Sequence, residues 1–309
     1  MAPMWHMNGR IGLAQEMEKA LGKFSGINLA MQTPMHADGS IDFARWGELI
    51  DLYIDAGVHG LVLGAGTGQH PYLTRQECTR LYELGAQRVD GRCHLICQSS
   101  ALVLDEVLER SKEAQGLGAD ALMILPPYLE GPEDDDGLFS FYEAIDGEVE
   151  TDIIGYNIPQ TTGIGISVDL FKRLNQLEHF NYIKDSAGNL ATHQEYLATG
   201  YNVLNGCDPN TVFAFIAGAQ GCIWGAANYM PHEAVRLYQL VASGDIAGAM
   251  ELWSRMIPSL LYVWSGNYVP RIKAASRLRG FDGGSVRAPL QNLSPEEERE
   301  LASRLEPLG

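Results

Sequence analysis

Gly60-Leu-Val-Leu63 and Ala121-Leu-Met-Ile-Leu125 are the stretches of sequence that decide the fold. Both are short and apolar at every position, whereas a strand with one wet face alternates between apolar and polar residues. Continuous apolar runs are typical of strands that are covered on both faces, as in a parallel sheet flanked by helices. The two stretches therefore predict a buried parallel sheet.

Similar short segments recur roughly every 20–35 residues, which is the length of a strand, a loop and a helix. Together with 60–63 and 121–125, the expected strands are residues 27–31, 94–98, 152–156, 182–184, 202–204 and 221–224. Amphipathic stretches lie between them, and Thr74 with Glu77 forms a capping-box pattern before one of these, residues 75–89. Eight βα units favour an α/β fold with a closed (β/α)₈ barrel, the TIM barrel, although periodicity alone also allows a doubly wound sheet.

The strand pattern ends near Tyr229, and only helical periodicity follows it. The expected C-terminal helices cover residues 231–243, 246–264, 270–278 and 295–305. We therefore expect an N-terminal extension over residues 1–23, a catalytic barrel over 24–229 and a C-terminal helical domain over 230–309.

Composition excludes several classes of protein. The net charge of −17 argues against a nucleic-acid partner, because phosphates require clustered Lys and Arg. No apolar window is long enough to span a membrane, and residues 1–23 are too polar for a signal peptide. The five cysteines are odd in number and scattered, which is typical of reduced thiols. We expect a cytoplasmic enzyme.

Lys184 is the one lysine at the end of a predicted core strand, in Tyr182-Ile-Lys-Asp-Ser186. Functional groups of such barrels lie at the C-terminal ends of the strands. Loss of hydration favours the neutral amine of a lysine, which can condense with a ketone to give an imine, and the protonated imine is an electron sink. The alternative is a structural lysine paired with a carboxylate such as Asp185, and position alone does not separate the two.

Two other strand ends carry candidate groups. Gly64-Ala-Gly-Thr-Gly68 lacks the lysine and spacing of a P-loop, but its N–H groups and the Thr67 hydroxyl could bind a carboxylate. A tight turn explains the same glycines. Tyr156 could transfer a proton if its hydroxyl faces Lys184, or it could be a core tyrosine. No His and Cys residues have zinc-ligand spacing, so we expect no metal site.

An ordered set of motifs runs from about Gly26 to Leu305, and on these the chain resembles the dihydrodipicolinate synthase / N-acetylneuraminate lyase superfamily. The motifs are Thr33-Pro-Met35, Gly66-Thr-Gly68, Pro127-Tyr128, Tyr156-Asn-Ile-Pro159, Ile183-Lys-Asp-Ser186, Gly206-Cys-Asp208 and Gly221-Cys-Ile-Trp-Gly-Ala-Ala-Asn228.

The resemblance implies a (β/α)₈ barrel with a helical C-terminal domain, assembled as a homotetramer that is a dimer of dimers. It implies an imine between a 2-oxo acid and Lys184, with no metal or organic cofactor. It also implies proton transfer by Tyr156 and binding of the substrate carboxylate by Gly66 and Thr67. The other implied substrate contacts are Tyr128, Gly206, Asp208 and Ile223.

Three positions depart from the synthase branch of that superfamily. Gly66 stands where a second hydroxyl residue is usual, Leu129 where a tyrosine usually reaches across a subunit interface, and residues 160–162 where an arginine is usual. We therefore expect a lyase or aldolase that acts on a 2-keto-3-deoxy sugar acid or a 4-hydroxy-2-oxo acid, releasing or adding pyruvate, or dehydrating its substrate through the same imine. The alternatives are 4-hydroxy-tetrahydrodipicolinate (dihydrodipicolinate) synthase and a catalytically silent barrel with a binding role.

Overall fold

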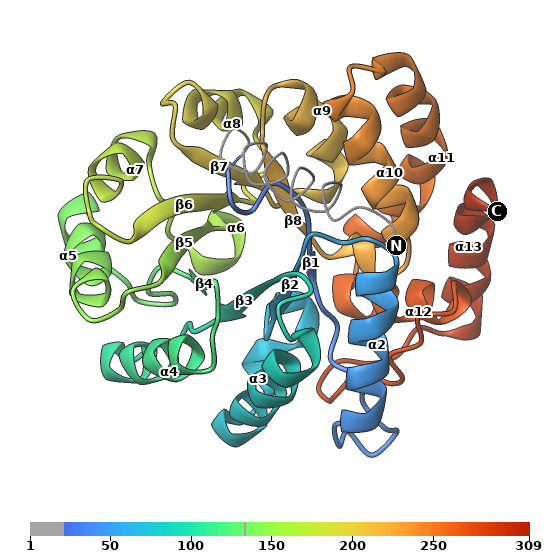
Figure 1. The fold of residues 1–309 in the computed structure, drawn as a ribbon. Coiled ribbons are helices and arrows are strands. Elements are labelled where there is room, and N and C mark those ends of the chain that lie inside the picture. Colours follow the sequence, from blue (N-terminus) through green and yellow to red (C-terminus); the bar gives the residue numbers. More distant parts are fainter. Residues whose placement is uncertain (1–21, 133) are drawn as a thin grey trace, which may run out of the picture.

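A closed parallel barrel forms the centre of the structure, a computed structural model that describes residues 22–132 and 134–309. The strands pair in sequence order, and β1 pairs with β8, which closes the barrel and rules out a doubly wound sheet (Figure 1). The expected (β/α)₈ fold is confirmed. The strands are β1 (Gly26–Ala30), β2 (Gly60–Leu63), β3 (His94–Gln98), β4 (Ala121–Ile124), β5 (Asp152–Asn157), β6 (Phe180–Asp185), β7 (Asn202–Asn205) and β8 (Gly221–Trp224).

Side chains fill the interior of the barrel below the strand ends. Phe24 lies at the N-terminal end, where its ring meets that of Tyr182 edge-on with centroids 4.9 Å apart. Above it, buried side chains such as Val62, Met123 and Ile154 form a compact interior cluster. Because packed side chains occupy the lower barrel, only its C-terminal end is left to bind a substrate.

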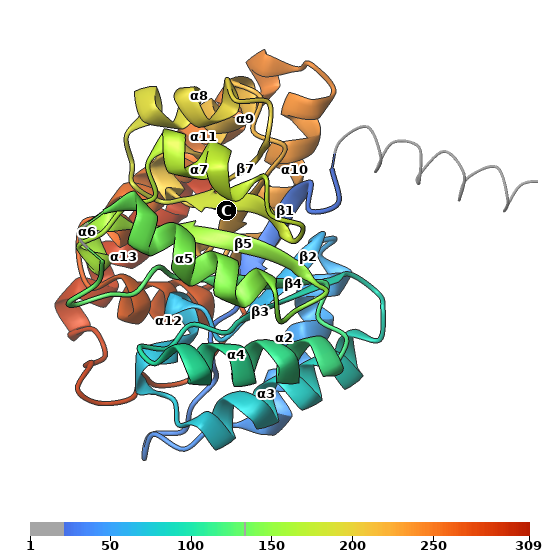
Figure 2. The same cartoon turned by 90° about the vertical axis from the view of Figure 1, so that its left-hand side faces the viewer.

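Helices surround the barrel and bury their apolar faces against the outer faces of the strands (Figure 2). The capping box expected at Thr74 and Glu77 is present at the start of α3. The barrel helices are α2 (Phe43–Asp55), α3 (Arg75–Val89), α4 (Leu104–Gly116), α5 (Asp135–Asp146), α7 (Val168–Leu174), α8 (Leu190–Leu197) and α9 (Thr211–Ile216), and α6 (Pro159–Thr162) is a single turn after β5.

The last helices are α10 (Pro231–Ala242), α11 (Ile246–Trp264), α12 (Tyr268–Leu278) and α13 (Pro295–Leu305). Helix α10 packs on β1 and α9, so it occupies the place of the eighth barrel helix. The domain boundary at 229/230 stays a prediction, and this packing favours a boundary after α10. The predicted extension over residues 1–23 lies outside the described residues except for its last two.

Helix α12 begins at Tyr268, two residues before the expected start at Pro270. A proline is accepted there because the first turn of a helix needs no backbone donor. The helix packs against two short 3₁₀ turns at the barrel mouth, η1 (Gly66–Gly68) and η4 (Ala226–Asn228). The start of α12 is thereby placed beside the C-terminal ends of the strands.

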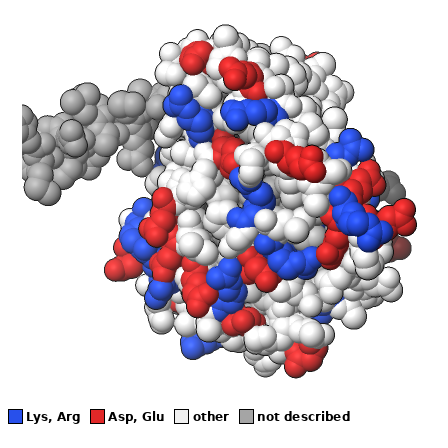
Figure 3. Space-filling model, turned by 90° about the vertical axis from the view of Figure 1, so that its right-hand side faces the viewer, with Lys and Arg blue, Asp and Glu red and all other residues white. Residues whose placement is uncertain are grey.

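The surface is mixed in charge. On the face shown in Figure 3, acidic and basic side chains are interspersed rather than gathered into a basic stripe. Among the described residues, no helix is both long and apolar enough to cross a membrane.

Lys273 fastens α12 to the barrel. Its side chain is buried, and its Nζ donates to the backbone oxygens of Thr33 at 2.7 Å and Gly283 at 3.1 Å, and also to that of Ser285. One ammonium group therefore joins the loop after β1 to the loop after α12, on the side where the pocket opens.

We expect Lys273→Met to lower the free energy of unfolding by about 3 kcal/mol, because buried carbonyl groups lose their donor. Urea unfolding followed by circular dichroism would measure the change. Lys172→Met is the matched control, since Lys172 is exposed and pairs with Asp169 on its own helix, and it should cost less than about 1 kcal/mol. Equal losses in the two variants would contradict the assignment.

Candidate active site

A cavity of about 510 Å³ opens at the C-terminal end of the barrel. It brings together seven of the eight residues that the sequence indicated; Tyr128 is the exception and does not line it. The seven come from strand ends and loops all around the barrel: Gly66, Thr67, Tyr156, Lys184, Gly206, Asp208 and Ile223.

Lys184 and Tyr156 are neighbours on adjacent strands. They lie opposite each other in the register of β5 and β6, so both side chains point into the barrel. Lys184 is 4% exposed, and its Nζ lies 3.8 Å from the centroid of the Tyr156 ring. This cation–π contact holds the amino group in the cavity next to the phenol.

Asp185 does not pair with Lys184, contrary to the structural alternative for that lysine. Its Oδ1 accepts a hydrogen bond from Asn157 Nδ2 at 3.0 Å, and its Oδ2 lies 3.0 Å from His193 Nδ1. Since successive side chains of a strand point to opposite faces, these groups lie outside the barrel wall, one residue beyond Lys184 and Tyr156. They lock the ends of β5 and β6 together.

Gly206 makes room for Lys184. A Cβ at this position would lie 2.7 Å from Lys184 Cε and 2.1 Å from Ser186 Oγ, closer than side-chain atoms can approach. The resemblance implied a substrate contact at Gly206, and the structure adds a packing reason for the same glycine.

Gly66 and Thr67 begin η1, directly above β2. As the first residues of a helical turn, they have N–H groups without an acceptor inside that turn. The turn is fastened by Thr33, whose Oγ1 donates to the Gly68 carbonyl oxygen at 2.7 Å. A Cβ at Gly66 would have no atom within 4 Å, so no steric clash requires a glycine here. The missing side chain instead leaves the cavity wider at this point.

Asp208 is a buried carboxyl group in the pocket wall, in η3 (Asp208–Asn210). Burial raises its pKa to about 6, while a hydrogen bond from Tyr268 and the positive charge of Lys184 act in the opposite direction. Its ionisation therefore changes in the range where many enzymes work.

Sequence reasoning missed the two aromatic residues that complete the wall, Trp264 and Tyr268. Both belong to the C-terminal helices, where no strand end marked them. Tyr128, which was expected in the site, is half-buried outside the cavity, and burial raises its pKa. The described residues contain no group of three or more His, Cys, Asp and Glu that could hold a metal ion.

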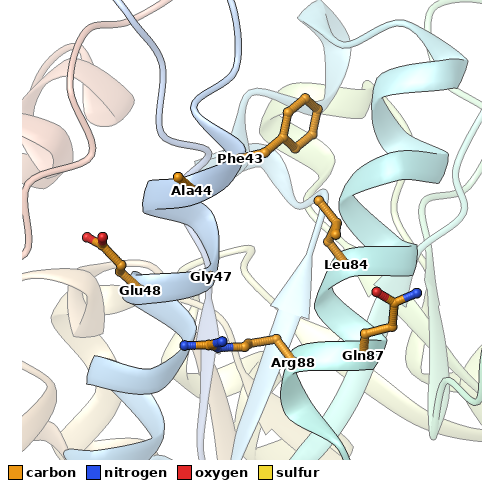
Figure 4. Close-up of a pocket in the computed structure, with 7 residues that line it drawn as sticks. All are labelled: Phe43, Ala44, Gly47, Glu48, Leu84, Gln87 and Arg88. Carbon is orange, nitrogen blue, oxygen red and sulfur yellow. The ribbon is translucent and has the colours of Figure 1, made fainter.

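A second hollow, of about 390 Å³, lies between α2 and α3, away from the strand ends (Figure 4). Arg88, at its edge, forms an ion pair with Asp51. The other lining residues are Phe43, Ala44, Gly47, Glu48, Leu84 and Gln87, and none of them belongs to the barrel mouth.

Comparison with known proteins places this barrel in a family. The family model described as the dihydrodipicolinate synthetase family matches residues 23–308. The chain belongs to this family. It is accordingly a lyase of the class I type, which works through a lysine Schiff base.

Individual proteins that are similar to this chain carry names of the same family. A 4-hydroxy-tetrahydrodipicolinate synthase of Aquifex aeolicus is 31% identical over 90% of this chain and 95% of its own. The corresponding protein of Oceanobacillus iheyensis is 28% identical over 91% and 96%. Among solved structures, a putative dihydrodipicolinate synthetase from Pseudomonas aeruginosa has a TM-score of 0.88 at 31% identity, covering 92% of this chain and 99% of that one.

We expect Gly206→Ala to slow imine formation about 10²-fold, the cost of displacing a reacting group by roughly 1 Å. The reason is that the new methyl group would push Lys184 Cε out of place. The measurement is the rate at which borohydride traps pyruvate on the folded protein. Gly116→Ala is the control, because a Cβ there meets no atom within 4 Å. An unchanged trapping rate in Gly206→Ala would contradict the packing role that we assign to this glycine.

Proposed function

We propose that Lys184 forms the Schiff base with the C2 carbonyl of a 2-oxo acid, and that pyruvate is the unit held in this way. The observation that carries the proposal is the position of Lys184, buried at the cavity floor against the Tyr156 ring with no carboxylate paired to it among the described residues. An unpaired amine in a cavity is available as a nucleophile.

The proposed roles of the other cavity residues follow from the position of Lys184. The substrate carboxylate lies against the free N–H groups of Gly66 and Thr67 and the Thr67 hydroxyl. The amine attacks C2, and the carbonyl oxygen leaves as water after taking up protons. Loss of a C3 proton then gives an enamine, because the protonated imine accepts the electron pair.

Two outcomes share that enamine. Its C3 can attack an aldehyde carbon, forming a C–C bond, while Tyr156 supplies the proton to the new C4 oxygen; the reverse sequence cleaves the bond. If a C4 hydroxyl leaves after C3 deprotonation, the same imine gives dehydration. The proposed chemistry needs no metal or organic cofactor, because the imine is itself the electron sink.

The first candidate for the overall reaction is the condensation of pyruvate with aspartate semialdehyde. The curated relatives reported above are named 4-hydroxy-tetrahydrodipicolinate synthase. These names support the synthase, which the sequence analysis kept as an alternative, better than the sugar-acid reaction that it placed first. The catalytically silent barrel is not carried forward, because the chain belongs to a family of lyases.

The second candidate is favoured by the charges of the cavity. Lys184 is the only Lys, Arg or His among the described residues that line it. Gln160 and Thr161 line the side where the synthase branch usually has an arginine, and Gln160 Nε2 donates to the Ser186 carbonyl oxygen at 2.8 Å. Uncharged donors with the Asp208 carboxyl suit hydroxyl groups better than a second carboxylate. A 2-keto-3-deoxy sugar acid or a 4-hydroxy-2-oxo acid fits this wall.

We expect Lys184→Arg to abolish trapping of pyruvate by borohydride, because a guanidinium stays protonated and is a poor nucleophile. Intact-protein mass spectrometry and peptide mapping would measure the adduct. Tyr156→Phe is the contrasting variant: it should keep the adduct but slow turnover about 10²-fold or more, the usual effect of losing a general acid–base group. An adduct in Lys184→Arg at the wild-type level would refute the assignment.

The two candidate reactions are separated by one comparison of substrates. If the chain is the synthase, kcat/KM for aspartate semialdehyde with pyruvate should exceed that for cleavage of every 2-keto-3-deoxy sugar acid tested by about 10²-fold or more, as expected for a site that pairs with the substrate's polar groups. The opposite order would identify the sugar-acid lyase. Coupled assays of semialdehyde consumption and pyruvate release measure both.

Assembly and location belong to the same proposal. We propose that the chain forms a homotetramer, a dimer of dimers, because the family resemblance implies this assembly. We also propose a cytoplasmic location, because the five scattered cysteines are typical of reduced thiols. One structurally similar protein, 25% identical, is described as a monomeric dihydrodipicolinate synthase variant, so the family does not impose one assembly. Native mass spectrometry would measure the state of this chain.

A further inference from the structure

One buried polar side chain of the cavity lacks a hydrogen-bond partner. Gln98 is the last residue of β3, and it lines the cavity although it is only 3% exposed. Its Oε1 is buried and has no hydrogen-bond partner among the described residues. A buried polar group without a partner costs free energy, and native proteins seldom leave one unless a ligand or water supplies the missing bond. Gln98 is therefore a candidate for contact with a bound molecule.

The alternation of side chains along β3 turns Gln98 into the barrel. Ile96 belongs to the interior cluster, whereas Leu95 and Cys97 pack in the core outside the barrel wall. Gln98 lies two residues beyond Ile96 and therefore points to the same side. Its backbone oxygen accepts a hydrogen bond from Tyr82 Oη at 2.5 Å, which fixes the end of the strand from the outside. The side chain thus extends into the cavity from a fixed point.

The order of the strands places Gln98 at one end of a bound 2-oxo acid. In an eight-stranded barrel that closes in sequence order, β2 lies opposite β6. A pyruvate unit held by Lys184 on β6, with its carboxylate against η1 above β2, directs that carboxylate toward the β2 side of the cavity. The strands beside β2 are β1 and β3, and their last residues, Ala30 and Gln98, both line the cavity. Of these two, only Gln98 has a polar side chain.

The carboxylate site has capacity for a further donor. A carboxylate offers about four lone-pair sites, and Gly66 and Thr67 supply two N–H groups and one hydroxyl. The nitrogen of a glutamine amide carries two N–H donors, and a half-turn of the amide exchanges its nitrogen with its oxygen. The amide of Gln98 can therefore present Nε2 to the carboxylate, and it does so without adding a second charge to the cavity.

We propose that Gln98 is a further substrate-binding residue, whose Nε2 donates a hydrogen bond to the C1 carboxylate of the 2-oxo acid held by Lys184. This inference rests on the proposed Schiff-base function, and it deepens that function by adding a specificity-determining contact from the strand next to the carboxylate site at Gly66 and Thr67. The contact favours ketones that carry a carboxylate beside the carbonyl over simple ketones.

Two ketones test the contact, because acetone has the methyl ketone of pyruvate but no carboxylate. Borohydride should trap pyruvate on the wild type faster than acetone. Gln98→Met, which keeps the length of the side chain but not its amide, should reduce that preference about tenfold or more, the effect of losing one hydrogen bond to a charged group. Its rate with acetone should stay at the wild-type value. Intact-protein mass spectrometry measures both adducts.

The dependence of trapping on pyruvate concentration shows where the contact acts. The carboxylate is present in bound pyruvate and in the imine alike, so the hydrogen bond holds both equally. Loss of such uniform binding raises the half-saturating concentration and leaves the maximal rate nearly unchanged. This is the pattern expected for Gln98→Met.

Unfolding of the ligand-free protein separates substrate binding from a structural role. Replacement of a glutamine that makes internal hydrogen bonds would leave its partners unpaired and lower the urea midpoint. The Oε1 of Gln98 has no such partner among the described residues. Gln98→Met should therefore leave the urea midpoint unchanged or raise it, as circular dichroism can measure.

Two further variants complete the design. Gln194→Met is the matched control, because Gln194 is exposed on α8 and its Nε2 donates to the Leu190 carbonyl oxygen of the same helix at 3.2 Å. It should change the rate with neither ketone. Gln98→Ala removes the amide without placing a sulfur in the barrel, and it should reduce the preference for pyruvate to a similar extent.

The outcomes separate the inference from the function on which it rests. Absence of a pyruvate adduct in the wild type would remove the Schiff-base function itself. An adduct in the wild type with an unchanged preference in both Gln98 variants would overturn the proposed contact alone. Equal losses with pyruvate and acetone would also overturn it, because they indicate a structural role. A reduced preference for pyruvate, with acetone trapping and the urea midpoint retained, is the expected result.

Discussion

The pairing of β5 with β6 is the constraint on which the rest of the site depends. It sets Tyr156 directly opposite Lys184, with both side chains pointing inward. One residue further, Asn157 and Asp185 point outward and hydrogen-bond to each other. A slip of this register by one residue would exchange the inward and outward pairs, because strand side chains alternate. The hydrogen bond between Asn157 and Asp185 therefore stabilises the register that places Tyr156 and Lys184 in the cavity.

Glycines, which have no side chain, shape the cavity as much as the larger residues do. Gly206 leaves the space that the Lys184 stem occupies, and Gly225 leaves the space into which Tyr268 and Thr67 project. Gly66 has a different role, since a side chain there would meet nothing and would only narrow the cavity. In a close-packed barrel, a reactive group can be reached by substrate only where neighbouring residues are small.

The cavity has two halves with different origins. One half, with Lys184, Tyr156 and Thr67, comes from the barrel and suits the pyruvate unit that family membership implies. The other part includes Trp264 and Tyr268 from the C-terminal helices, so the barrel alone does not form the whole cavity wall.

The sequence by itself determined the eight βα units and singled out Lys184, because these depend on local patterns: apolar runs at a regular spacing and one lysine at the end of a strand. Closure of the barrel depends on the pairing of β1 with β8, which no local pattern shows. It could not decide whether Asp185 pairs with Lys184, since that depends on which way each side chain points across the barrel wall. It included Tyr128, which the fold leaves outside the cavity, and it missed Tyr268, which lies 84 residues beyond Lys184 in the chain. Only the tertiary structure could join Tyr268 to Asp208, because the closure of the barrel and the anchoring of α12 by Lys273 bring distant segments together without leaving a local sequence signal.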